Sequence, residues 1–167
     1  MVAFLSVYPT VSIISKQNQL IQLGIDEDEY LNLQEMREMV IQELYNDLTA
    51  FVVPKSLDFP IHEVLPLLEK LNSGIYTIDQ LIPEIVFLKN SSLKTTLKNY
   101  YQDLAGLDVI DTVMGFIKEN QNASKAAKRL FMHRNTLNYR LDHFIEKTEI
   151  DIKSFHGALA IYLLFRS

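Results

Sequence analysis

Hydrophobic and polar positions alternate along the first part of the chain and then take up a helical period. Two short β-rich runs, residues 11–15 and 19–23, flank the polar residues 16–18, which predicts a hairpin of two strands. From residue 30 onward the apolar positions recur three and four residues apart, as on one face of a helix. The first predicted helix, residues 30–46, carries an apolar stripe of Leu33, Met36, Val40, Ile41 and Leu44.

Residues 48–89 continue this N-terminal part with one strand and two helices. The β-branched run 48–53 stops before Pro54 and predicts a buried strand. A helix follows to residue 71, and a start near Glu63 would put Pro66 in its first turn, where proline is tolerated. The next helix is capped by Thr77 or Asp79. With a further strand expected at residues 4–8, residues 1–89 are predicted to be a small α+β domain.

The remaining residues predict helices only. Residues 90–107 form a connector, and residues 108–167 form a C-terminal domain in which Asp108 caps the first helix. The last helix, about residues 154–165, is apolar on more than one face, so it is either a central packing helix or partly covered by a second subunit. The predicted fold class is therefore an α+β N-terminal domain followed by an all-α helix-turn-helix domain.

Residues 122–141 predict two short helices joined by a tight turn. Asn122 or Ser124 caps the first helix, and Ala126 and Ala127 are small enough for another helix to cross closely. Residues 131–133 make the turn. The second helix, about residues 134–147, has a buried stripe of Leu137, Leu141, Phe144 and Ile145.

Charge is distributed unevenly over a chain of net charge −5. Residues 1–107 hold 7 Lys and Arg against 14 Asp and Glu, whereas residues 118–147 hold 7 against 3. A basic helical pair on an acidic protein is typical of a DNA-binding element, although a solvated helix face would give the same pattern.

The polar face of the second helix has side chains suited to duplex DNA. Arg bonds guanine and Asn bonds adenine through two hydrogen bonds each, so the expected groove contacts are Arg134, Asn135, Asn138 and Arg140. Expected backbone contacts are Ser124, Lys125, Lys128, Arg129, Thr136 and Tyr139. His133 directly precedes the same helix and is expected to contact DNA, to cap the helix or to bond to the local backbone.

The run from Asn122 to Leu141 resembles the C-terminal helix-turn-helix of PucR-type regulators, the purine-catabolism and sugar-diacid family, and the similarity extends over residues 107–120, 146–151 and 158–164. It resembles the Fis-type helix-turn-helix less closely. The family resemblance implies a bacterial, cytoplasmic transcription regulator that binds duplex DNA as a homodimer. It also implies a degenerate cyclase-like N-terminal part, here truncated and without cyclase activity because the paired glycines of the cyclase signature are absent. The sequence leaves open whether this chain is a fragment of a longer regulator.

Other functions have weaker support in the sequence. The chain has no cysteine, no glycine-rich phosphate loop and no nucleophile motif, so we expect no enzyme activity and no cofactor. The acidic residues 26–29 favour a helix start over a metal site, because glycine and glutamate are missing where a calcium loop needs them. The N-terminus is unlike a signal peptide, and no apolar run is long enough to span a membrane. An interaction or ligand-sensing module without DNA binding is the alternative function, and an effector remains undefined.

Overall fold

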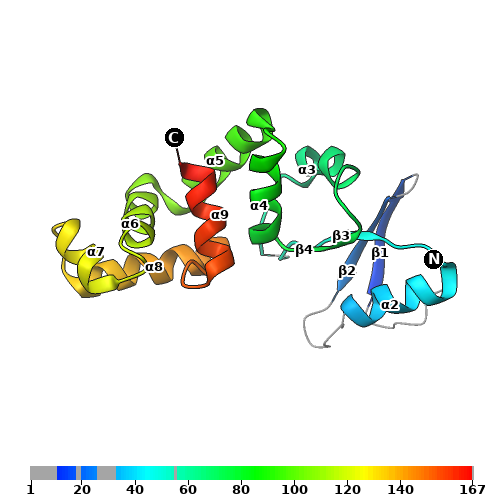
Figure 1. Ribbon diagram of the computed structural model, residues 1–167, viewed down its shortest axis with the longest axis horizontal. Coiled ribbons are helices and arrows are strands. Elements are labelled where there is room, and N and C mark those ends of the chain that lie inside the picture. The colour runs from blue at the N-terminus through cyan, green and yellow to red at the C-terminus, as the bar shows by residue number, and fades with distance from the viewer. Residues whose placement is uncertain (1–10, 18–19, 26–32, 55, 167) are drawn as a thin grey trace. The chain divides into compact units, whose positions relative to one another are not determined.

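The computed structural model describes residues 11–17, 20–25, 33–54 and 56–166, most of which are helical (Figure 1). The chain divides into two compact units, residues 1–50 with 73–75 and residues 51–72 with 76–167. In the described part of the chain, no helix combines the length and the apolar composition needed to cross a membrane.

The first unit contains a hairpin and one helix. Strands β1 (Val11–Gln17) and β2 (Leu20–Ile25) pair antiparallel, with Val11 opposite Ile25 and Gln17 opposite Leu20. The predicted hairpin is confirmed, but residues 16 and 17, which were predicted to lie in the turn, belong to β1. Helix α2 (Leu33–Leu44) buries Met36 and Val40, which lie four residues apart on one face. The strand predicted at residues 4–8 and the acidic residues 26–29 lie outside the described residues.

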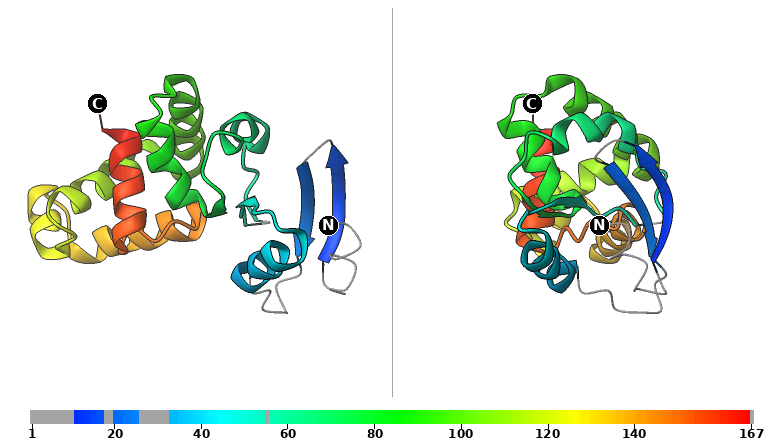
Figure 2. Two further views of the ribbon diagram at one scale, coloured as in Figure 1. Left: turned by 45° about the vertical axis from the view of Figure 1, so that its right-hand side comes forward. Right: turned by 90° about the vertical axis from the view of Figure 1, so that its right-hand side faces the viewer.

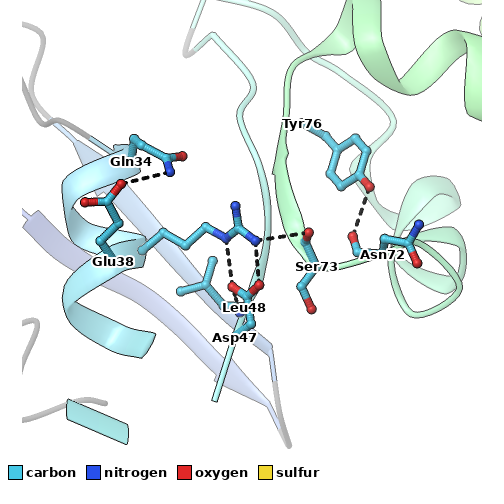
Figure 3. A network of polar contacts seen from close by, with 8 residues as sticks. Gln34, Glu38, Asp47, Leu48, Asn72, Ser73 and Tyr76 are labelled. Carbon is cyan, nitrogen blue, oxygen red and sulfur yellow. Dashed lines mark hydrogen bonds and ion pairs between the residues drawn. The ribbon is translucent and has the colours of Figure 1, made fainter. Parts of the chain in front are cut away.

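An ion pair links α2 to the segment that follows it (Figure 3). The guanidinium of Arg37 donates to both carboxylate oxygens of Asp47, at 2.7 and 2.5 Å, and to the carbonyl oxygen of Ser73 at 3.3 Å. The hydrogen bond from Arg37 holds the pKa of Asp47 below its ordinary value of 3.8, because it favours the ionised carboxylate.

Two three-residue strands, β3 (Thr49–Phe51) and β4 (Gly74–Tyr76), form a second small sheet. The Gly74 N–H donates to the Leu48 carbonyl, and the Val52 N–H donates to the Tyr76 carbonyl. The prediction of a buried strand at residues 48–53 was wrong in one respect, because β3 is only half-buried. A sheet of two strands leaves much of each strand without a neighbour. Strand β4 was not predicted.

The second unit begins with three helices, α3 (Ile61–Leu68), α4 (Ile78–Phe87) and α5 (Ser91–Ala105). Helix α3 starts two residues earlier than predicted, so Pro66 lies in its second turn. Thr77, rather than Asp79, is the cap of α4 and forms a capping box with Gln80.

Four helices complete the second unit: α6 (Leu107–Lys118), α7 (Ala123–Arg129), α8 (Arg134–Thr148) and α9 (Phe155–Phe165). Gly106 separates α5 from α6 with a φ of 88°, a conformation that glycine adopts without strain. Asp108 was predicted to cap α6, but Gly106 occupies the cap position and Asp108 lies in the first turn.

Helix α9 lies between α4 and α6 and packs against both (Figures 1 and 2). Its buried residues face several directions, which identifies it as the packing helix of this unit. The same core includes Leu81 and Ile85 of α4 and Leu97 of α5, each fully buried. These contacts group residues 76–107 with the C-terminal helices. The division into residues 1–89, 90–107 and 108–167 stays a prediction, as does an α+β fold for the N-terminal part.

Candidate nucleic-acid interface

Helix α7 is short and is fixed by one cap and two small residues. The Asn122 side chain accepts a hydrogen bond from the Lys125 N–H at 3.0 Å, so Asn122 rather than Ser124 is the cap. Ala126 and Ala127 are both buried against the neighbouring helices. Gly115 of α6 serves the same close packing, since a methyl group there would lie 2.8 Å from the Leu130 side chain.

The turn between α7 and α8 uses a left-handed residue and a histidine cap. Phe131 has a φ of 51°, and its side chain is 97% exposed. The Met132 N–H donates to the Ala127 carbonyl at 3.0 Å, which closes the turn. His133 then caps α8, because its ring nitrogen Nδ1 accepts from the Asn135 N–H at 3.2 Å. Of the roles predicted for His133, the structure therefore contains the helix cap.

Helix α8 presents a buried stripe and an exposed polar face. Leu137, Leu141 and Phe144 are buried in the core with α5, α6 and α7, as predicted, whereas Ile145, also predicted to be buried, is only half-buried. The exposed side chains on α7, the turn and α8 comprise nine of the predicted contacts: Ser124, Lys125, Lys128, Arg129, His133, Arg134, Asn135, Thr136 and Tyr139. These nine exposed residues lie on α7, on the turn and in the first turns of α8, and we call this set the α7–α8 face.

Three predicted contacts are less free than the others. Arg129 pairs with Glu119 at 2.5 Å, although its side chain keeps 57% of its surface exposed. Arg140 is half-buried and bonds to α6 rather than projecting into solvent. Asn138 is also half-buried, at the edge of the face.

Several side chains near this surface were not predicted to take part in it. His143 stacks on Tyr139, with ring centroids 6.2 Å apart and planes 12° from parallel. Their separation of four residues on one helix is a signal that sequence analysis could have used. Asp108 and Thr112 of α6, and Glu119 directly after it, touch predicted contact residues ten to 32 positions away, and no local pattern indicates such pairs.

The comparisons with known proteins agree with this arrangement. The PucR C-terminal helix-turn-helix domain family matches residues 109–167. An uncharacterized protein of Bacillus subtilis, YxkF, is 37% identical over 91 residues, which are 53% of this chain and 31% of YxkF. The proline-responsive transcriptional activator PutR of the same organism is 29% identical over 91 residues, 54% of this chain and 22% of PutR.

A third relative, the DNA-binding transcriptional activator AdeR of Bacillus subtilis, is 39% identical over 56 residues, 34% of this chain and 13% of AdeR. The chain thus spans less than a third of the length of each of these relatives. No solved structure matches the chain. One assignment follows from the matched family and from the packing of α7 and α8 on α6: residues 109–167 are a PucR-type C-terminal helix-turn-helix domain.

Proposed function

We propose that this protein is a sequence-specific regulator of transcription that binds duplex DNA with α8 in the major groove. The observation that carries the proposal is the α7–α8 face. Its basic and amide side chains are exposed on α7 and α8, and the opposite side of α8 is buried. An α-helix fits the major groove, and the first turns of such a helix reach the base edges.

Roles within the face follow from the chemistry of each side chain. Arg134, Asn135 and Asn138 lie in the first two turns of α8 and are proposed to contact bases. The other exposed residues are proposed to contact the sugar-phosphate backbone, which orients the protein without reading sequence: Ser124, Lys125, Lys128, Arg129, His133, Thr136 and Tyr139. His143 extends this set, because its ring stacks on that of Tyr139.

We also propose that the protein acts as a homodimer on a palindromic site. One helix-turn-helix contacts only a few base pairs, and dimers of such units read half-sites about 34–36 Å apart. Named relatives are transcriptional activators, which supports regulation as the role rather than catalysis.

The test is fluorescence anisotropy of mixed-sequence duplex DNA at two salt concentrations, followed by selection of a preferred site. We expect affinity to fall steeply as salt rises, because bound Lys and Arg release counterions from the phosphates. Binding that is absent at low salt, in protein that is folded by circular dichroism, would overturn the proposal and favour an interaction or ligand-sensing module.

Two substitutions separate base contacts from phosphate contacts. Arg134→Ala should cost about 1–3 kcal/mol at the selected site and relax the preference at one base pair. Lys128→Ala should weaken binding to all DNA sequences alike and reduce the slope of log affinity against log salt concentration by about 1. Lys70→Ala, which removes the same charge from an exposed position after α3, is the matched control and should leave both quantities unchanged.

A further inference from the structure

Arg140 is held by three acceptors at the start of α6. Its Nη2 lies 3.0 Å from the Asp108 carboxylate, and its Nη1 donates to the Thr112 hydroxyl at 3.1 Å and to the Asp108 carbonyl at 3.3 Å. The Thr112 hydroxyl, on a residue that is 1% exposed, donates in turn to the Asp108 carbonyl at 2.8 Å. The guanidinium thus joins α8 to the first turns of α6 through one connected set of bonds.

The position of Arg140 on α8 separates it from the side chains proposed to contact bases. Each residue of an α-helix advances about 100°, so Arg140 projects roughly 160° away from Asn138 and roughly 140° from Asn135. Arg140 therefore lies on the flank of α8 that meets α6, and its side chain keeps 30% of its surface exposed.

We propose that Arg140 is a positioning residue, which fixes the angle of α8 on α6 through Asp108 and Thr112 and does not contact DNA. This role replaces the groove contact that the sequence predicts for Arg140. Its effect on DNA binding rests on the proposed function, because an altered angle of α8 would displace Arg134, Asn135 and Asn138 together.

A substitution of Asp108 distinguishes best between a DNA contact and a positioning role for Arg140, because the two roles predict opposite changes in DNA affinity. If Arg140 contacted DNA, Asp108→Asn would release the guanidinium of Arg140 and remove a negative charge near the DNA. The affinity for DNA would then stay the same or rise. If Arg140 positions α8, the same substitution weakens specific binding. Asp111→Asn removes the same charge from an exposed position on the same helix and is the matched control.

The experiment measures DNA binding and urea unfolding for wild type, Asp108→Asn, Arg140→Met and the double variant, with Asp111→Asn beside them. Methionine keeps the apolar stem of the arginine and removes its hydrogen bonds. We expect each single variant to bind the selected site roughly tenfold more weakly, and the double variant to be no worse than the singles, because they break one shared set of bonds. The salt slope and the preference at each base pair should match wild type.

Three results would overturn the proposal. They are a salt slope reduced by about 1 in Arg140→Met, a preference lost at a single base pair, or Asp108→Asn binding as tightly as Asp111→Asn. If the wild-type protein bound no DNA, the proposed function would fail. The urea unfolding of the single and double variants would still test the positioning role. Additive effects of the two single substitutions on the unfolding midpoint would refute it, and a shared effect would support it.

Discussion

Replacing Gly157 by alanine should destabilise the second unit strongly, because the added methyl group would meet backbone. A Cβ on Gly157 would lie 2.2 Å from the carbonyl oxygen of Asp151 and 2.7 Å from its carbonyl carbon. That carbonyl already accepts hydrogen bonds from the Ser154 N–H at 3.0 Å and the Ser154 hydroxyl at 2.8 Å. It also lies between Ile150 and Ile152, both of which are buried.

The magnitude follows from two opposing contributions. Overpacking of a core by extra carbon typically costs about 1–3 kcal/mol, and a clash with fixed backbone belongs at the upper end of that range. Alanine recovers about 1 kcal/mol through its better helix propensity. The net loss is then about 2 kcal/mol, which for a unit of this size lowers the melting temperature by roughly 8 °C.

The assay is thermal unfolding followed by circular dichroism at 222 nm, with Gly115→Ala as the matched control. Gly115 is also a buried helical glycine, but the atoms nearest its added methyl belong to the Leu130 side chain, at 2.8 to 3.1 Å. A leucine side chain can rotate where a carbonyl held by two hydrogen bonds cannot. Gly115→Ala should therefore cost less than half as much, and the reasoning fails if Gly157→Ala melts with wild type or if Gly115→Ala is the more damaging change.

Three further predictions concern caps, a buried hydroxyl and acid stability. Asn122→Ala removes the cap of α7 and should cost about 1 kcal/mol in urea unfolding, with weaker DNA binding at unchanged base preference. Thr148→Val leaves the Ile150 N–H, 3.2 Å from the threonine hydroxyl, without its partner, so we expect a loss of about 1–3 kcal/mol and faster hydrogen exchange at that amide. The lowered pKa of Asp47 means that its stabilising bond to Arg37 is present above pH 3.8 and is lost as the pH falls through the folded-state value. An NMR titration should find the Asp47 midpoint below 3.8 and higher in Arg37→Met, and an unchanged midpoint in that variant would count against the hydrogen bond as the cause.

Local signals made the helix-turn-helix predictable. Each of its helices carries its own polar cap, Asn122 and His133, directly before an apolar stripe, so its limits follow from short-range chemistry. The exposure of the nine predicted contact residues likewise follows largely from helical period, because it is set by the position of the buried stripe.

Features that depend on distant partners were not predictable in the same way. Strand β4 is three residues long and exists through pairing with β3, more than 20 residues earlier. The role of Arg140 depends on Asp108, 32 residues away, and the residue type alone suggested a base contact. Its angular separation from Asn138, however, was available from the sequence and would have placed the two on different sides of α8.

The cap at the start of α8 also determines the hydrogen-bonding character of the imidazole. Because Nδ1 of His133 accepts the Asn135 N–H, it must keep its lone pair, and the ring proton of the neutral side chain resides on Nε2. The backbone at the start of α8 thereby selects one tautomer. The exposed ring presents a single N–H donor of fixed direction at the entrance to the helix, which suits a phosphate oxygen. Aspartate at this position would preserve the cap, because its carboxylate accepts from the same N–H, and it has no donor, so the capping role and the proposed phosphate contact of one side chain can be separated by a single substitution.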